Sequence, residues 1–145
     1  MFVLDQRLTE DTAPVRALKL CTVLLMKDSS MPWLILVPQR AGIKEVYELE
    51  AGDRLILMEE AARASRVIKA LYAPDKINIG SLGNIVTQLH LHVIGRFSTD
   101  RAWPGPVWGA GQGVPYSKEG LDMRGFSYKP PPLDGCMDWG GRGGG

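Results

Sequence analysis

The chain of 145 residues has few of the features that mark several common protein classes. It has only two cysteines, Cys21 and Cys136, and no Cys-x-x-Cys pair, which excludes a disulfide scaffold and a zinc ribbon or finger. Neither sign of charge is in marked excess, since the chain has 17 Lys and Arg residues and 16 Asp and Glu residues. The basic residues are scattered, so no surface for duplex nucleic acid or for an anionic membrane is expected.

Long apolar runs and phosphate-binding loops are also missing. No uncharged apolar run approaches the roughly 18 residues that a membrane span needs. The N-terminal residues include Asp5 and Glu10 and lack the apolar stretch of a signal peptide. No Gly-Lys-Ser/Thr is present, and the glycines at 109, 111 and 113 lack the strand and helix of a nucleotide loop. We therefore expect a cytoplasmic protein in which Cys21 is an inert buried thiol.

Apolar patterning predicts two strands over residues 18–26 and 33–37, joined as an antiparallel hairpin by a polar turn that contains a proline. Apolar residues at helical spacing predict a helix over 53–72, with Asp53 as its N-cap and Ala73-Pro74 at its end. Its charged residues are expected to form a solvated face: Arg54, Glu59, Glu60, Arg63, Arg66 and Lys69. Two further strands are predicted over 76–79 and 88–97.

These elements indicate one α+β domain with a mainly antiparallel sheet, one long helix and a shorter one. A hydrophobic content of 45% supports a single core of ordinary size. The composition changes towards the C-terminus, where 12 of the 17 glycines lie at or beyond Gly105. We expect the folded domain to span residues 1–116 and residues 117–145 to be a loosely ordered Gly- and Pro-rich tail.

The two histidines of the chain, His90 and His92, are two residues apart in a predicted strand. Alternate residues of a strand lie on the same face, so Gln88, His90 and His92 are expected to line one side. The apolar residues between and after them are expected to face a core. Two histidines at this spacing alone fit either metal ligands or hydrogen-bonding residues.

The residues around the pair narrow this choice. Asn78-x-Gly80 and Gly83-Asn84 precede it, Gln-Leu-His-Leu-His-Val-Ile encloses it, and Arg96 and Trp103-Pro-Gly-Pro follow. This ensemble resembles the histidine triad family of nucleotide hydrolases and transferases, most clearly over residues 76–109 and more weakly back to residue 18. Gln88 replaces the first of the three histidines of the family signature.

The resemblance implies a homodimer of compact α+β fold that binds a nucleotide or dinucleotide and needs no cofactor and no obligatory metal. It assigns the nucleophile to His90, which would attack an α-phosphorus and form a nucleotidyl-histidine. A neutral imidazole is a competent nucleophile near pH 7, and the covalent step divides one difficult displacement into two. Gln88 can donate a hydrogen bond but cannot act as an acid, so impaired or redirected chemistry is expected.

Other residues are candidates for binding the substrate. His92 is the expected donor to a non-bridging oxygen, and main-chain N–H groups near Gly83 and Asn84 would cradle the phosphate. The resemblance adds Asn78. Three further assignments have structural alternatives. Arg96 and Arg40 would face phosphates, although Arg40 fits a surface ion pair better. Trp103 would belong to a lid or to a rigid loop. Asp28 would bond a ribose or be a solvated turn residue.

Three classes of function remain open. The first is an enzyme that cleaves a nucleoside phosphate anhydride, ester or phosphoramidate through His90. The second is a nucleotide-binding module of the same fold, with little turnover because of Gln88. The third is a metal protein that uses His90 and His92 as ligands, which would need a third ligand from Cys21 or a carboxylate.

Overall fold

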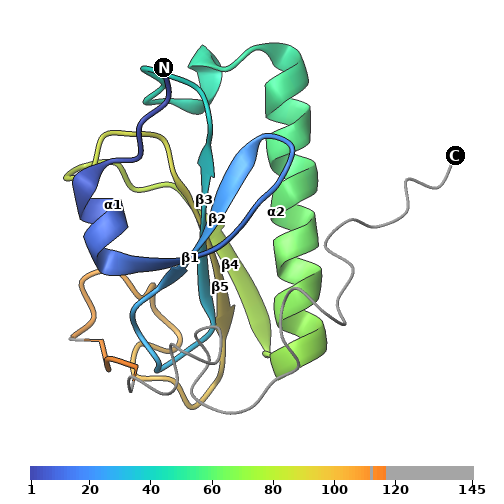
Figure 1. The fold of residues 1–145 in the computed structure, drawn as a ribbon. Helices are drawn as coiled ribbons and strands as arrows, with labels where there is room; N and C mark the ends of the chain where they lie inside the picture. Colours follow the sequence, from blue (N-terminus) through green and yellow to red (C-terminus); the bar gives the residue numbers. More distant parts are fainter. Residues whose placement is uncertain (112, 117–145) are drawn as a thin grey trace, which may run out of the picture.

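Five strands form one antiparallel sheet in the order β1-β2-β3-β5-β4 (Figure 1). The computed structural model describes residues 1–111 and 113–116, so the expected tail lies outside the described residues. The α+β class with one long and one short helix is confirmed. The elements are α1 (Gln6–Asp11), β1 (Thr12–Ala17), β2 (Cys21–Met26), β3 (Trp33–Pro38), the 3₁₀ helix η1 (Val46–Glu48), α2 (Ala51–Tyr72), β4 (Lys76–Gly80) and β5 (Leu91–Arg96).

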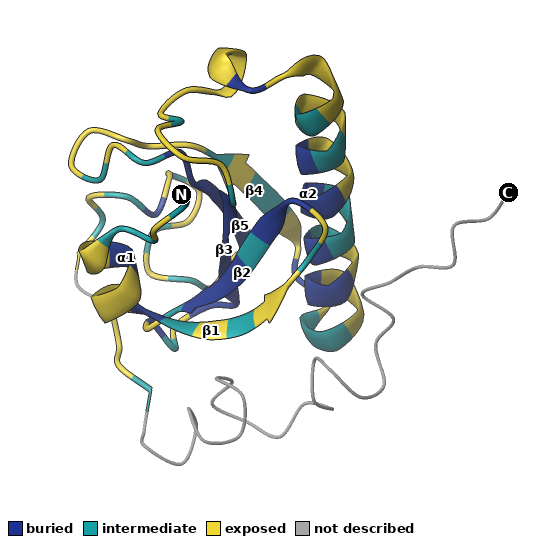
Figure 2. Ribbon diagram, turned by 45° about the horizontal axis from the view of Figure 1, so that its top comes forward, coloured by how far each residue is buried: buried dark blue, intermediate teal, exposed yellow. Residues whose placement is uncertain are grey.

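The apolar runs become the centre of the sheet. Every residue of β3 and β5 is buried, whereas β1 at the edge is largely exposed (Figure 2). The predicted hairpin is confirmed, since β2 pairs antiparallel with β3 across the polar turn. Strand β5 is the last in the sequence, yet it lies between β3 and β4. The histidine segment is therefore anchored on both sides by neighbouring strands.

The two faces of the sheet carry two separate apolar clusters. Helix α2 covers one face, where Leu91 and Val93 of β5 join the larger cluster. Residue Ile94 of β5 packs on the opposite face with Trp33 and with Leu8 of α1. The alternation predicted for the histidine segment is confirmed for its apolar side. No helix in the described part of the chain is long and apolar enough to cross a membrane.

Helix α2 begins two residues earlier than predicted. Glu50 is its N-cap, and Asp53 lies in its first turn, where its carboxylate accepts two hydrogen bonds from Arg40. Asp53 as N-cap is therefore wrong, while the end of the helix at Ala73, which adopts the left-handed conformation before Pro74, is confirmed.

The predicted solvated face of this helix is wrong at one residue. Glu60 is 1% exposed, and its carboxylate accepts the main-chain N–H groups of Leu20 and Cys21 at 2.8 and 2.9 Å. Those two groups would otherwise be buried without a partner where the chain enters β2. Glu60 thus fastens α2 to the sheet, and helical charge patterning alone does not distinguish it from its solvated neighbours.

Strand β5 begins at Leu91, three residues later than predicted. Gln88 and Leu89 lie before the ladder, because the Leu89 N–H donates to the Ile43 carbonyl at 3.0 Å and not to a neighbouring strand. The segments of α1 and β1 were not predicted. Strand β1 has only six residues, contains Pro14 and shows a register shift beside it, which leaves little strand periodicity in the sequence.

Gly95 of β5 lies close against neighbouring elements. A Cβ atom there would lie 2.7 Å from Pro32 Cγ, 2.8 Å from Ile68 Cγ2 and 3.3 Å from Pro74 Cβ. Two of these groups belong to rigid rings, so we expect Gly95→Ala to lower the free energy of unfolding by about 1–3 kcal/mol. Gly52→Ala, in α2 with nothing within 4 Å of the added Cβ, is the control and is expected to be neutral or stabilising. Urea unfolding of both variants measures this, and equal stabilities would contradict it.

Candidate functional site

His90 and His92 lie together on the sheet face opposite α2. His92 is in β5, paired with Ile35 of β3 on one side and with Gly80 of β4 on the other. The two imidazole centroids are 5.0 Å apart, and the residues are only 4% and 6% exposed. The sequence prediction that the two rings share a face is thus confirmed by their contact. The pair is adjacent, buried and held by the centre of the sheet.

The hydrogen bond of His90 determines which ring nitrogen is available. Its Nδ1 lies 2.7 Å from the main-chain oxygen of Gln88. A carbonyl oxygen only accepts, so Nδ1 carries the proton and donates it. The lone pair of the neutral ring is then on Nε2, and His90 is oriented as a nucleophile through that atom.

His92 has the opposite arrangement. The indole Nε1–H of Trp33 donates to its Nδ1 at 2.9 Å, and an indole nitrogen can only donate. The ring of Trp108 lies edge-on to it at 5.2 Å. Burial, and then the neighbouring His90, lowers the pKa of His92 to about 4. His92 is therefore a neutral ring whose remaining hydrogen, on Nε2, can be donated to a ligand.

The low pKa of His92 links the stability of the protein to pH. In the unfolded chain the ring titrates near 6.5, so between about pH 6.5 and 4 the unfolded state binds more protons than the native state. We expect stability to fall as the pH drops through this window, by about 3 kcal/mol in total, and this contribution to change no further below it. Urea unfolding at pH 7 and 4.5 measures the loss, which His92→Gln should largely remove. A native His92 that titrates near 6.5 by NMR would contradict the prediction.

Gln88 holds the N-terminal segment. Its side-chain oxygen accepts the N–H of Asp5 at 2.8 Å, and its side-chain nitrogen donates to the carbonyl of Val3 at 2.8 Å. Both ends of the amide are therefore used by main chain that is more than 80 residues distant in sequence. Gln88 thus secures the N-terminal segment beside the pair.

Asn78 and Arg96, both expected near phosphate, are joined to each other. Arg96 is 2% exposed and donates to Asn78 Oδ1 at 2.7 Å and to the Gly105 carbonyl at 2.8 Å. It also forms a two-point ion pair with Asp100, with bonds of 2.8 and 3.0 Å. The hydrogen bond from Arg96 holds the pKa of the Asp100 carboxyl well below its usual range. Arg96 is thus fully engaged within the protein, and it orients Asn78.

Asp28 is buried at 4% exposure, so its interpretation as a solvated turn residue is wrong. It accepts from the N–H and hydroxyl of Ser30, from the Val114 N–H, and from Arg101 at 3.0 Å. Burial raises its pKa, but these hydrogen bonds outweigh burial and leave the pKa below its usual value. Asp28 therefore ties the hairpin turn to Arg101 and to the segment at Val114, contacts between residues far apart in the sequence.

Trp103 does not contact the histidines, whereas Trp108 does. The guanidinium of Arg96 lies 5.9 Å from the centroid of the Trp103 ring, which is 38% exposed. Trp108 lies against Gly80, where an added Cβ would be 2.8 Å from the indole. Its Nε1 is buried and has no hydrogen-bond partner among the residues that the structure describes. Sequence reasoning favoured Trp103 and missed Trp108 and Trp33. Of the two interpretations of the loop, its anchoring by Arg96 and Asp100 favours the rigid one.

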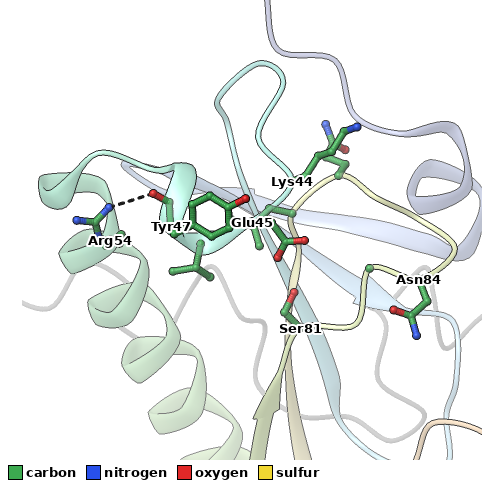
Figure 3. Close-up of a pocket in the computed structure, with 10 residues that line it drawn as sticks. Lys44, Glu45, Tyr47, Arg54, Ser81 and Asn84 are labelled. Atoms are coloured by element: carbon green, nitrogen blue, oxygen red, sulfur yellow. Dashed lines mark hydrogen bonds between the residues drawn. The ribbon is translucent and has the colours of Figure 1, made fainter.

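The remaining candidate residues for substrate binding line two different cavities. A cavity of about 740 Å³ is bounded by the segment before α2 and by the loop after β4 (Figure 3). Gly83, Asn84 and Gln88 line it, and the two histidines do not. A second cavity of about 610 Å³ is lined by Trp33 and Trp108, the two indoles that contact His92, but by neither histidine itself. It also contains Asp28 and Arg101, together with glycines of the following loop.

The predicted surface ion pair of Arg40 is confirmed, with 2.7 Å to Asp53. Cys21 is completely buried, and burial raises the pKa of its thiol, in agreement with an inert role. Among residues 1–111 and 113–116, no three His, Cys, Asp or Glu side chains are grouped as metal ligands would be. The third ligand that a metal site on the histidine pair would need is therefore not assembled in this part of the chain.

Comparison with known proteins identifies the fold. The family model of the HIT domain matches residues 8–99. The chain belongs to the histidine triad (HIT) family. It is 49% identical to a HIT protein of Sinorhizobium meliloti 1021, covering 86% of this chain and 92% of that one, with a TM-score of 0.82. The identity is 46% to a histidine triad protein of Marinobacter aquaeolei VT8, with 86% and 91% covered and a TM-score of 0.83.

A third solved relative is the histidine triad protein blr8122 of Bradyrhizobium japonicum, at 41% identity, 85% and 92% coverage and a TM-score of 0.81. No curated protein matches the chain. This HIT protein therefore has the fold of a family of nucleotide-binding hydrolases and transferases.

Proposed function

We propose that this HIT protein cleaves a nucleoside phosphate anhydride, ester or phosphoramidate through a nucleotidyl-histidine on His90. The observation that carries the proposal is the orientation of the two rings. The Gln88 carbonyl leaves the lone pair of His90 on Nε2, and Trp33 leaves a hydrogen on Nε2 of His92. One ring is thus a nucleophile and its neighbour, 5.0 Å away, a neutral donor.

In the proposed reaction, His90 Nε2 attacks the α-phosphorus and the leaving group departs. His92 Nε2–H donates to a non-bridging oxygen, where negative charge increases in the transition state. Water then attacks the phosphorus of the nucleotidyl-histidine and releases the nucleoside monophosphate. His92 needs no charge for either step, in agreement with its low pKa.

We place the nucleoside in the cavity of about 610 Å³. This cavity shares Trp33 and Trp108 with the contacts of His92, and its size is typical of small-molecule sites. The unpartnered Nε1 of Trp108 is a donor for a ligand oxygen or nitrogen. Asn78 would present its amide nitrogen to phosphate, since Arg96 holds its oxygen. Asp28 would reach a ribose only by exchanging one of its present partners.

A nucleotide-binding module with little turnover is the second candidate. Two observations favour it: the Gln88 amide is occupied by the N-terminal segment, and both histidines are buried. Binding that is retained while no product forms, and that His90→Ala does not change, would support this alternative.

The deciding experiment traps the covalent intermediate. The protein is mixed with a diadenosine polyphosphate, an adenylyl phosphoramidate or an adenylyl–sugar, quenched within milliseconds to seconds, and measured by intact mass and peptide mapping. We expect an added nucleotidyl group on His90, absent in His90→Ala. An adduct on another residue, or product release without any adduct, would contradict the proposed mechanism. The homodimer, the cytoplasmic location and a domain boundary near residue 116 remain predictions.

A further inference from the structure

Within residues 1–111 and 113–116, no side chain at the histidine pair can protonate a leaving group. An amine or an alkoxide is a poor leaving group unless it receives a proton as its bond to phosphorus breaks, and a general acid typically speeds such steps by roughly 10²–10⁴-fold. A phosphate or carboxylate departs as a stable anion without that proton. The substrate class therefore depends on whether any residue at the pair can act as an acid.

Gln88 cannot. Its amide does not ionise, and its nitrogen and oxygen are both occupied by the main chain of Val3 and Asp5 at 2.8 Å. To approach a leaving group, the side chain would have to give up two hydrogen bonds and release the N-terminal segment.

His92 cannot act as an acid either, because the indole N–H of Trp33 donates to its Nδ1, the nitrogen that would have to be protonated. An acidic imidazolium carries hydrogens on both nitrogens, and a hydrogen on Nδ1 would face the Trp33 N–H 2.9 Å away. The ring is also buried, which penalises the charged form. His92 is thus a hydrogen-bond donor through Nε2 that does not transfer its proton near neutral pH.

No other side chain replaces them in the described residues. The side chains in ring or hydrogen-bond contact with the two imidazoles are Trp33 and Trp108, which do not ionise at physiological pH. Glu10 and Asp11 also line the second cavity, but both are exposed and neither is hydrogen-bonded to an imidazole. Asp28 in the same cavity and Asp100 in the loop after β5 are ionised and paired with arginines. A carboxylate in that state accepts protons and does not supply them.

We propose that this site is selective for anhydrides, in which the α-phosphorus of a nucleotide is joined to a second phosphate or to a carboxylate. This inference rests on the proposed function. His90 Nε2 forms the N–P bond while the bridging P–O bond breaks, and the leaving anion keeps the electron pair and needs no proton. Water then forms the new P–O bond, the N–P electron pair returns to Nε2, and the proton of the water passes to bulk solvent.

The test is a series of adenosine 5′-phosphate derivatives that differ only in the leaving group: a phosphate, two phenols of different acidity, an alkyl alcohol and an alkylamine. We expect kcat/KM for AMP release to fall steeply as the pKa of the leaving group rises, with the anhydride at least about 100-fold above the alkyl ester and the phosphoramidate. Similar values across the series would overturn the inference while the proposed function stands. No AMP from any member would overturn the proposed function, and this inference with it.

A second measurement does not require turnover. The chain has only two histidines, so imidazole ¹⁵N NMR of the full-length protein gives two ring patterns, and His90→Ala assigns them. We expect His92 to carry its hydrogen on Nε2 and to remain neutral at pH 6. A hydrogen on Nδ1, or a charged ring at that pH, would overturn the inference.

Two tryptophan variants separate the hydrogen bond from packing. Trp33→Phe removes the donor to His92, and we expect the ratio of phosphoramidate to anhydride turnover at pH 6 to rise about tenfold as His92 becomes able to act as an acid. Trp108→Phe removes an indole at similar distance that makes no hydrogen bond to the ring, and this ratio should not change. An equal rise in both variants, or none in Trp33→Phe, would contradict the role given to Trp33.

Discussion

His90→Ala is expected to lower nucleotide release by roughly 10⁴–10⁶-fold, since losses of this size follow removal of a catalytic nucleophile. His92→Ala should cost less, about 10²–10³-fold, the effect of losing one donor to the transition-state oxygen. The expected difference has a structural reason. The lone pair on His90 Nε2 has no substitute at the pair, whereas the amide nitrogen of Asn78 is proposed as a second donor to the phosphate. Single-turnover rates with the best anhydride measure both losses.

The comparison needs a control for folding, because both rings are buried. Leu55→Ala changes a side chain that is 72% exposed on α2 and should leave the rate unchanged. Near-ultraviolet circular dichroism, which reports the packing of the tryptophans, should be preserved in all three variants. A folded His90→Ala protein that retains more than a few per cent of the wild-type rate would refute nucleophilic catalysis by this residue.

Arg96→Met is expected to be the most destabilising single change at the loop that follows β5, at about 3–5 kcal/mol. Arg96 and Asp100 both have side chains that are only 2% exposed, so loss of the guanidinium leaves a buried carboxylate without its partner. The Asn78 amide and the Gly105 carbonyl lose their donor at the same time. Urea unfolding at pH 7 measures the loss.

The chain provides a matched control for this prediction. Arg40 and Asp53 form an ion pair of the same two-point kind, but the Arg40 side chain is 45% exposed. Arg40→Met should therefore cost less than about 1 kcal/mol. If the two variants were equally stable, burial of the Arg96–Asp100 pair would not be the source of its contribution.

Periodicity in the sequence predicted the elements that carry strong apolar patterns. The hairpin of β2 and β3, the end of α2 at Ala73 and the inward side of the histidine strand follow from local patterns of two or 3.6 residues. The helix start was wrong because Asp53 is engaged by Arg40, a tertiary contact that local capping rules do not include. Elements α1 and β1 were missed for a different reason, since each has only six residues and too little periodicity to predict it.

The sequence predicted which residues form the candidate site better than it predicted how they are arranged. His90, His92 and Gln88 were found from their spacing, but the partners that determine their chemistry lie elsewhere in the chain. Trp33 is 59 residues from His92, and Asp5 is 83 residues from Gln88. A single sequence contains no signal for such pairs. Gly83 and Asn84 line a different cavity from the one lined by Trp33 and Trp108, a separation that becomes visible only when the loop is folded.

The position of β5 in the sheet has a consequence for synthesis of the protein. Strand β3 has β2 on one edge, but its other partner, β5, is made more than 50 residues later. Until residue 96 has emerged from the ribosome, one edge of β3, a strand made only of apolar residues, has no partner strand. Other chains can pair with that edge, which is a risk of aggregation. Because His92 meets Trp33 only when β5 docks on β3, the reactive pair is assembled with the closing of that edge. A chain that is incompletely synthesised or folded therefore lacks the Trp33–His92 bond that leaves the hydrogen of His92 on Nε2.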